Sequence, residues 1–209
     1  MLAEIVTCLR VWSQGTLHNV TVFSAEGPSF GAGLDREWIQ SESADDRRAL
    51  QFASSTFHRE LFGLRIPSIA LVHGHAVGTS MDLAVMCDLR VASDDATFGH
   101  PEILLGGPPL FTPLRSVVGE GWARELCLTG RTIGAAEAER IGLVNHVVER
   151  GQLLDKGREL AAEVARVPRA ALVATKSFFH GSPGIDDFIH TQHDQLFEVG
   201  LTYREVDNS

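Results

Sequence analysis

The stretch HGHAVGTSMDLAVMCDLR, residues 73–90, places a turn of glycine and small residues directly ahead of an apolar helical segment that carries one acid, Asp82. Such a turn exposes backbone N–H groups that have no partner within the helix, and the helix dipole adds positive potential there. This helix end suits a negative charge that develops on an oxygen atom. We therefore expect the N–H of Thr79 to donate to an oxyanion.

A second glycine loop, SAEGPSFGAGLD at residues 24–35, follows a short β-rich run. Its turn at Gly33 and Leu34 offers another N–H, and two donors from separate loops would form an oxyanion hole. Each loop alone also fits an ordinary tight turn. Neither loop matches a Walker phosphate loop or a complete dinucleotide fingerprint.

Around these loops the chain twice repeats the order helix, strand and glycine turn. Helical spacing from Leu2 to Trp12 precedes the β-rich run 19–23, and helical spacing from Asp45 to Leu64 precedes a buried strand that begins at Ser68. Further expected strands are 89–93, 96–99 and 143–148, with helices at 120–128 and 135–141. From Gln152 onward the pattern is mostly helical.

Composition limits the class of protein. The 209 residues are 44% hydrophobic, enough for one domain with a buried core, and the net charge of −9 argues against a nucleic-acid binder or a basic membrane-binding face. No apolar run is long enough to span a membrane, so we expect a cytoplasmic protein. Cys8, Cys87 and Cys127 lie in apolar segments without CxxC spacing, which favours buried thiols and no metal site.

Two acids stand in apolar surroundings, Asp82 in the helical segment and Glu102 in FGHPEILLG. A carboxyl group in an apolar pocket has a raised pKa and can act as an acid or a base near neutral pH. Two alternatives remain open: Asp82 as a helix N-terminal carboxylate that stabilises the dipole, and Glu102 as a partly exposed turn residue. GTSMD lacks the G-x-S-x-G elbow, so a hydrolase using Ser80 is a third, weaker hypothesis.

Four blocks together carry a family resemblance: PSFGAGLD, IALVHGHAVGTSMDLAVMCDLRVAS, ATFGHPEILLG and ELCLTGRTIGAAEAERIGLVNHVV. In this order and spacing they resemble the enoyl-CoA hydratase/isomerase (crotonase) superfamily. The resemblance implies an α/β crotonase (ClpP-like) fold of repeated β-β-α units. It also implies a spiral core over 1–150, without the usual first strands, and a C-terminal helical trimerisation region over 151–209.

The resemblance also implies a ligand and a site. The ligand is an acyl-CoA or acyl-carrier thioester, with no metal and no cofactor beyond the coenzyme A of the substrate, and the assembly is a homotrimer or a hexamer made of two trimers. Leu34 and Thr79 match the oxyanion-hole N–H groups, and Asp82 and Glu102 match the two acids. The substrate-binding positions are Ala32, Gly33, Asp35, Gly78 and Leu110. Arg36 or Lys176 would meet phosphates, or would be ordinary solvated surface cations.

Hydration or dehydration of an enoyl-CoA is therefore the first hypothesis. Isomerisation or decarboxylation in the same fold, or a non-catalytic binding subunit, are the alternatives. Asp82 stands where the hydratases carry Glu, and Leu110 stands where the dienoyl isomerases carry a further Asp. His73, His75 and His100 flank the proposed site, and we interpret them as structural residues.

Overall fold

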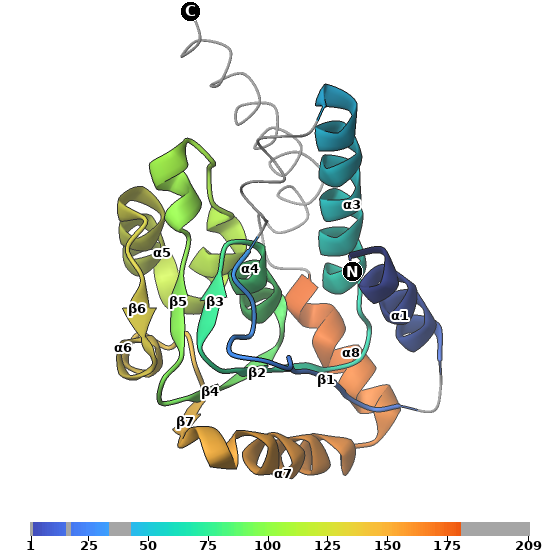
Figure 1. Cartoon of the computed structure of the whole chain (residues 1–209). Coiled ribbons are helices and arrows are strands. Elements are labelled where there is room, and N and C mark those ends of the chain that lie inside the picture. The colour runs from blue at the N-terminus through green and yellow to red at the C-terminus, as the bar shows by residue number, and fades with distance from the viewer. Residues whose placement is uncertain (1, 16–17, 34–42, 181–209) are drawn as a thin grey trace, which may run out of the picture.

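A computed structural model of the protein describes residues 2–15, 18–33 and 43–180 (Figure 1). Its strands form two sheets, one in the order β1-β2-β4-β7 and the other in the order β3-β5-β6. The strands are β1 (Thr21–Phe23), β2 (Ser68–Val72), β3 (His75–Val77), β4 (Leu89–Ser93), β5 (Thr97–Gly99), β6 (Ile133–Gly134) and β7 (His146–Val148). All pairs are parallel except β5 with β6.

Pairs of consecutive strands divide between the two sheets. Strand β2 lies in the larger sheet and β3 in the smaller, and β4 and β5 repeat this division, so that Ile69 pairs with Leu89 and His75 with Thr97. Every residue of β2 is buried, as expected for a parallel strand covered on both faces. The β-β-α repeat implied by the sequence is thus confirmed.

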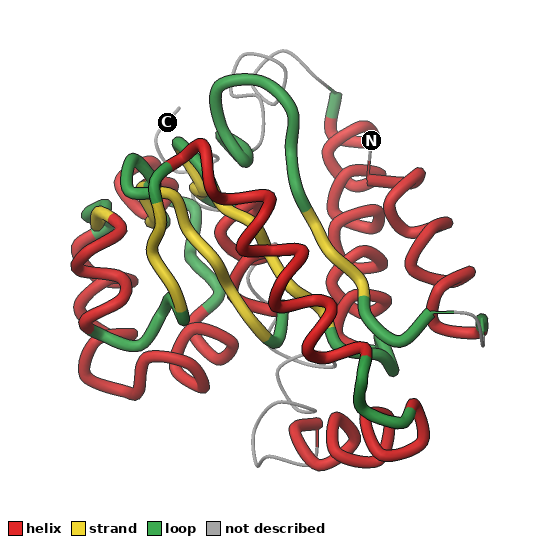
Figure 2. Tube along the Cα trace, turned by 90° about the horizontal axis from the view of Figure 1, so that it is seen from below, coloured by secondary structure: helices red, strands yellow, loops and turns green. Residues whose placement is uncertain are grey.

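The helices cover these sheets. They are α1 (Leu2–Gln14), α3 (Ala44–Phe62), α4 (Thr79–Met86), η1 (Pro101–Leu105), α5 (Phe111–Thr129), α6 (Ala135–Arg140), η2 (Arg150–Gln152), α7 (Leu153–Ala165) and α8 (Arg169–His180), where η marks a 3-10 helix. Helix α7 lies across the larger sheet against β2 and β4, which Figure 2 shows from below. Helices α1 and α3 pack together beside the sheets (Figure 1).

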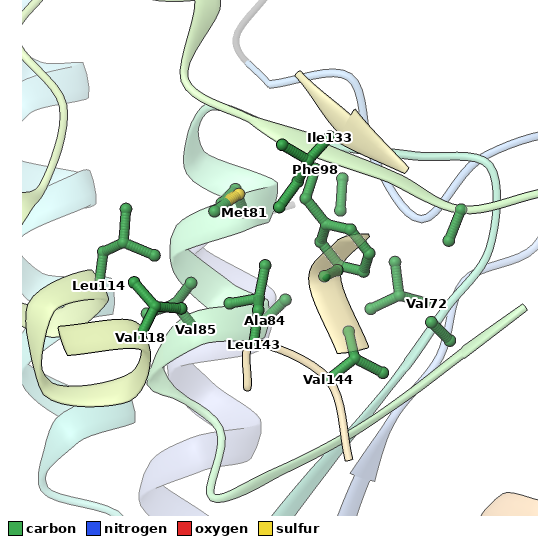
Figure 3. Close-up of a cluster of buried hydrophobic side chains, with 14 of the residues drawn as sticks. Val72, Met81, Ala84, Val85, Phe98, Leu114, Val118, Ile133, Leu143 and Val144 are labelled. Atoms are coloured by element: carbon green, nitrogen blue, oxygen red, sulfur yellow. The ribbon is translucent and has the colours of Figure 1, made fainter. Parts of the chain in front are cut away.

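Helix α4 runs through the main hydrophobic core. Its Met81, Ala84 and Val85 are buried, and they lie among side chains of α5 and the smaller sheet, including Leu114 and Phe98 (Figure 3). Because α4 is apolar on several faces, an acid on this helix is carried into the interior. The core therefore places Asp82 where water is largely excluded.

Helix α7 approaches the sheet at a glycine. A Cβ atom on Gly157 would lie 2.5 Å from Cδ1 of Leu71 in β2, closer than carbon atoms can pack. We expect Gly157→Val to lower the free energy of unfolding by about 2 kcal/mol, because overpacking forces side chains from their rotamers. Thermal denaturation measures the loss. Gly121→Val, on a helix with open space around it, is the control, and equal stability of the two variants would contradict this packing.

Most predicted elements are confirmed, although their bounds differ in places: the expected helix 120–128 begins at Phe111, and the expected strand 143–148 is limited to 146–148. Residues 75–77 form a strand rather than only a turn, and 101–105 form a 3-10 helix. Cys8 is exposed, so only Cys87 and Cys127 are buried thiols. Within the residues described, no helix has both the length and the apolar character needed to cross a bilayer. The division at residue 150 and the trimerisation role of 151–209 stay predictions, and 181–209 lie outside the described residues.

Candidate active site

The two glycine loops come together at the start of α4. Gly78 caps the helix with φ 58° and ψ −131°, and its N–H donates to the carbonyl of Gly99 at 3.1 Å. A Cβ atom on Gly33, where φ is 80°, would lie 3.1 Å from the carbonyl oxygen of Val77 and 3.7 Å from Cα of Gly78. Glycine therefore suits both positions, for backbone conformation and for the close approach of the loops.

The first loop is held in this place by a short ladder to β3. The N–H of Gly31 donates to the carbonyl of His75 at 2.8 Å, and the N–H of Val77 donates back to the carbonyl of Gly31 at 3.2 Å. Thr79 is the first residue of α4, so its N–H lies beyond the reach of the intrahelical bonds. Leu34, the predicted second donor, lies outside the described residues.

The two predicted acids share one neighbour, His100. Its Nδ1 is 2.8 Å from Oε1 of Glu102, and its Nε2 is 3.5 Å from Oδ1 of Asp82. The imidazole is buried, with 1% of its side chain exposed, and Asp82 has 8% exposed. The structure therefore brings both predicted acids into one buried group, with a titratable ring between them.

Asp82 has a second histidine on its other oxygen. His58 of α3 is buried, and its Nε2 is 3.6 Å from Oδ2 of Asp82. Its Nδ1 is 2.8 Å from the carbonyl oxygen of Ser54, one helical turn earlier, which fixes the orientation of the ring. Prediction of a buried Asp82 is confirmed, and two histidines from separate elements face it.

Glu102 is placed by the 3-10 helix η1. The N–H of Gly107 donates to the carbonyl of Glu102 at 2.9 Å, and Gly106 ends the helix with φ 83°. A Cβ atom on Gly78 would lie 3.6 Å from Oε2 of Glu102, so the carboxylate reaches the glycine turn ahead of α4. Its side chain is 32% exposed, which makes it the accessible member of the pair rather than a fully buried acid.

The electrostatics of this group follow from its burial and its charges. Burial alone lowers the pKa of His100, but the charge of Asp82 and the hydrogen bond and charge of Glu102 outweigh it, so the pKa of His100 is raised above its ordinary value. Burial, with smaller contributions from Asp82 and Glu102, raises the pKa of the Cys127 thiol to about 12. The thiol is thus neutral at physiological pH, while His100 tends to hold a proton.

The remaining predicted positions differ in their surroundings. Gly78 and Gly33 line the junction of the two loops, whereas Ala32 is exposed and Leu110 is buried at the start of α5. Their contacts with substrate stay predictions. Asp35 and Arg36 lie outside the described residues.

Lys176 was predicted to meet a phosphate, yet it is buried and its Nζ is 2.7 Å from Oδ2 of Asp88 and 2.9 Å from the carbonyl oxygen of Ile66. A buried ammonium group is held only with such partners, because an isolated charge in the interior is strongly disfavoured. Lys176 therefore joins α8 to the turn after α4, and the structure does not support its assignment to a ligand.

The enoyl-CoA hydratase/isomerase family model matches residues 1–194. This chain belongs to that family. A probable enoyl-CoA hydratase of Mycobacterium leprae is 41% identical over 145 residues, which are 68% of this chain and 56% of the relative. A crotonyl-CoA hydratase of Syntrophomonas wolfei is 37% identical over 152 residues, 71% of this chain and 58% of the relative. The chain thus spans less than two thirds of these relatives.

Solved structures agree on the fold. An enoyl-CoA hydratase of Bacillus anthracis superposes with a TM-score of 0.83 at 27% identity, over 97% of this chain and 80% of that chain. A second structure, described as a probable enoyl-CoA hydratase of Mycobacterium thermoresistibile, superposes with a TM-score of 0.85 at 26% identity. The match covers 98% of this chain and 87% of that chain. The crotonase fold expected from the four sequence blocks is confirmed.

Two residues of the site escaped the sequence analysis. His58 lies 24 positions before Asp82 in the chain, and nothing in its helix separates it from an ordinary core histidine. His100 was interpreted as structural, although it directly precedes the Pro101 and Glu102 pair that drew attention. Two buried histidines beside one buried acid become visible only when α3 and α4 are placed together.

Proposed function

We propose that the protein adds water to 2-enoyl-CoA thioesters, and removes it from 3-hydroxyacyl-CoA thioesters, through an enolate-like state. The observation that carries the proposal is the placement of Glu102 against the Gly78 turn, with Asp82 joined to it through His100. The N–H of Thr79, at the start of α4, and the two carboxyl groups thus lie in one region. Hydratase-named relatives in the same family support this choice.

The chemistry divides among these groups. Addition of water at Cβ places negative charge on the thioester oxygen, which the N–H groups of Thr79 and Leu34 would stabilise. One carboxylate takes the proton of the attacking water, and the other carboxyl group gives a proton to Cα. Holding water, thioester and acids in one arrangement removes much of the entropic part of the barrier.

Isomerisation of a double bond is the second candidate. A dienoyl-CoA isomerase of Dictyostelium discoideum is 38% identical over 139 residues. The side chain of Asp82 is also one methylene shorter than the Glu that hydratases carry at this position. Leu110 argues against it, because this apolar residue stands where those isomerases carry a further acid. An isomerase would move a proton between carbons and leave the mass of the substrate unchanged.

Loss of the conjugated-thioester absorbance of crotonyl-CoA tests the proposal. We expect the purified protein to remove this absorbance catalytically and to reach the same end point from 3-hydroxybutyryl-CoA. No change with crotonyl-CoA or with longer 2-enoyl-CoA esters, beside turnover of a 3-enoyl or dienoyl ester, would replace hydration by isomerisation. Thermal stabilisation by CoA esters without turnover of any of them would indicate a binding subunit.

Ser80→Ala is expected to keep wild-type turnover to within about a factor of three, because the Ser80 hydroxyl packs beside Gly31 and takes no part in the proposed proton transfers. The Ser80 hydroxyl fills the space beside Gly31, where a Cβ atom would collide with it. Steady-state kinetics on crotonyl-CoA provide the check. Loss of nearly all activity in this variant would revive the hydrolase hypothesis.

The proposal also covers the assembly and the cellular setting. We propose that the protein forms a homotrimer or a hexamer made of two trimers, and that it acts in cytoplasmic fatty acid metabolism. Exposed leucines near the site support a contact between subunits, since Leu104 is 70% and Leu128 is 78% exposed. The two leucines lie on adjoining elements. Leu128 is near the end of α5, and a Cβ atom on Gly130, which caps α5, would lie 3.2 Å from Cγ of Leu104 on η1. Light scattering after size exclusion measures the mass of the assembly.

A further inference from the structure

The ring of His100 bridges two acids that sit on different elements. Nδ1 faces Glu102 on η1 and Nε2 faces Asp82 on α4, at 2.8 and 3.5 Å. The two nitrogens of an imidazole lie on different sides of the ring, so each can exchange a proton with its own carboxyl group. This geometry is that of a link between the two acids rather than of a core histidine satisfied by backbone.

Hydration creates a need for such a link. At the end of each turnover the carboxylate that deprotonated the water carries an extra proton, and the carboxyl group that protonated Cα has lost one. The next turnover requires the opposite distribution. Asp82 has 8% of its side chain exposed, so exchange of its proton with bulk water is hindered by the surrounding core.

We propose that His100 is a positioning residue that returns the proton from one carboxyl group to the other after each turnover. This inference rests on the proposed hydration. The imidazole accepts a proton at the nitrogen facing the protonated acid and releases one from the other nitrogen to the ionised acid. The transfer leaves the ring as its other tautomer, and rotation of the ring restores the first tautomer before the next transfer. No proton is gained or lost overall, and in dehydration the transfer runs in reverse.

Other titratable side chains also face this group. From α3, His58 faces the second oxygen of Asp82 at 3.6 Å. From α5, Cys127 feels the charges of both acids and is neutral at physiological pH. The two charges that act on His100 are those of Asp82 on α4 and Glu102 on η1. With one proton shared among Asp82, His100 and Glu102, the three carry a net charge of −1.

The charge state predicts the pH dependence. The charges of Asp82 and Glu102 raise the pKa of His100, which favours the shared proton on its imidazole. Turnover should therefore fall when pH rises through that raised pKa. In His100→Gln the ring with the raised pKa is absent, so the alkaline limit of turnover moves to lower pH.

The first test compares His100→Gln with the wild-type protein on crotonyl-CoA across pH. We expect kcat to fall by about 10²-fold with KM nearly unchanged, since a glutamine can hold Glu102 by a hydrogen bond but cannot transfer a proton. The alkaline limit of kcat should move to lower pH. An unchanged kcat and an unchanged pH profile would overturn the proposal. His75→Gln, at an exposed histidine bound to Thr97, is the matched control.

A second test separates proton transfer from packing. His100→Ala leaves a ring-sized space, and added imidazole should restore turnover at a fixed substrate concentration. Pyrazole has the same size, but its nitrogens are adjacent and cannot face two acids on different sides. Equal restoration by both rings would show that His100 only fills space. If neither ring restores turnover, the pH profile of His100→Gln decides whether His100 transfers a proton: an unchanged profile overturns the proposal.

Titration of the His100 ring by nuclear magnetic resonance keeps this inference distinguishable from hydration itself. We expect the ring to titrate above the ordinary histidine range in the wild-type protein and lower in Asp82→Asn and Glu102→Gln. Absence of hydration by the wild-type protein defeats the proposed function whatever the titration gives. A titration at or below the ordinary range defeats the proton link, even in an active hydratase.

Discussion

Replacing Glu102 with Gln is expected to lower kcat for hydration of crotonyl-CoA by about 10³-fold, the usual contribution of a positioned acid or base. The amide keeps the size of the side chain and can still hydrogen-bond His100, which now lies 2.8 Å from Oε1. The substitution removes the carboxyl group that exchanges a proton at the solvent-accessible end of the group formed by Asp82, His100 and Glu102. Steady-state kinetics on the purified variant measure the loss.

Binding separates this chemical loss from a structural one. Calorimetric titration with a CoA ester should give a similar dissociation constant for Glu102→Gln and the wild-type protein, because the backbone donors at the Gly78 turn are kept. Glu120→Gln is the matched control, since that carboxylate pairs with Arg124 on the surface of α5. Full activity of Glu102→Gln would remove Glu102 from the mechanism.

Arg90→Met is expected to cost the largest amount of stability, about 3 kcal/mol or more of the unfolding free energy. The buried guanidinium donates to the carbonyl groups at the end of α4, including those of Ala84 and Cys87, and to Leu143 at 2.6 Å. The last carbonyls of a helix lack intrahelical partners, and buried carbonyls left unsatisfied cost about 1–3 kcal/mol each. Methionine fills the space without supplying donors.

Thermal denaturation checks this expectation, with a drop in the melting temperature of about 10 °C for a domain of this size. Arg158→Met is the control, because Arg158 is largely exposed and pairs with the exposed Asp155 within α7. Loss of turnover should accompany the loss of stability, since α4 carries both Thr79 and Asp82. Equal melting temperatures of Arg90→Met and the control would contradict a structural role for Arg90.

The sequence predicted helices and strands well where the hydrophobic pattern agreed with the positions of proline, glycine and other small residues. The apolar run after Pro67 became the buried strand Ser68–Val72, and the turn of small residues became the start of α4. The acid at position 82 was correctly placed in the interior, because it lies between core residues on the same short helix. Motifs also singled out Thr79, whose N–H is the proposed oxyanion donor, and Glu102, the proposed acid or base.

What the sequence could not supply is which side chains meet across elements. His58 and His100 belong to segments with no pattern in common, and only packing of α3 and η1 around α4 brings them to Asp82. For Lys176 the sequence suggested a contact with phosphate that the structure does not support. Its ammonium group is buried and paired with Asp88. Distances between segments depend on the whole core, which periodicity within one segment does not encode.

Hydration in water enriched with heavy oxygen tests the central claim most directly. The protein is incubated with crotonyl-CoA in such water, and the acyl product is analysed by mass spectrometry. We expect a product heavier than the substrate by one molecule of labelled water, with the heavy oxygen at Cβ, and labelling about 10³-fold slower when Glu102→Gln is used. A product of unchanged mass, or none at all, would contradict hydration by this carboxylate cluster.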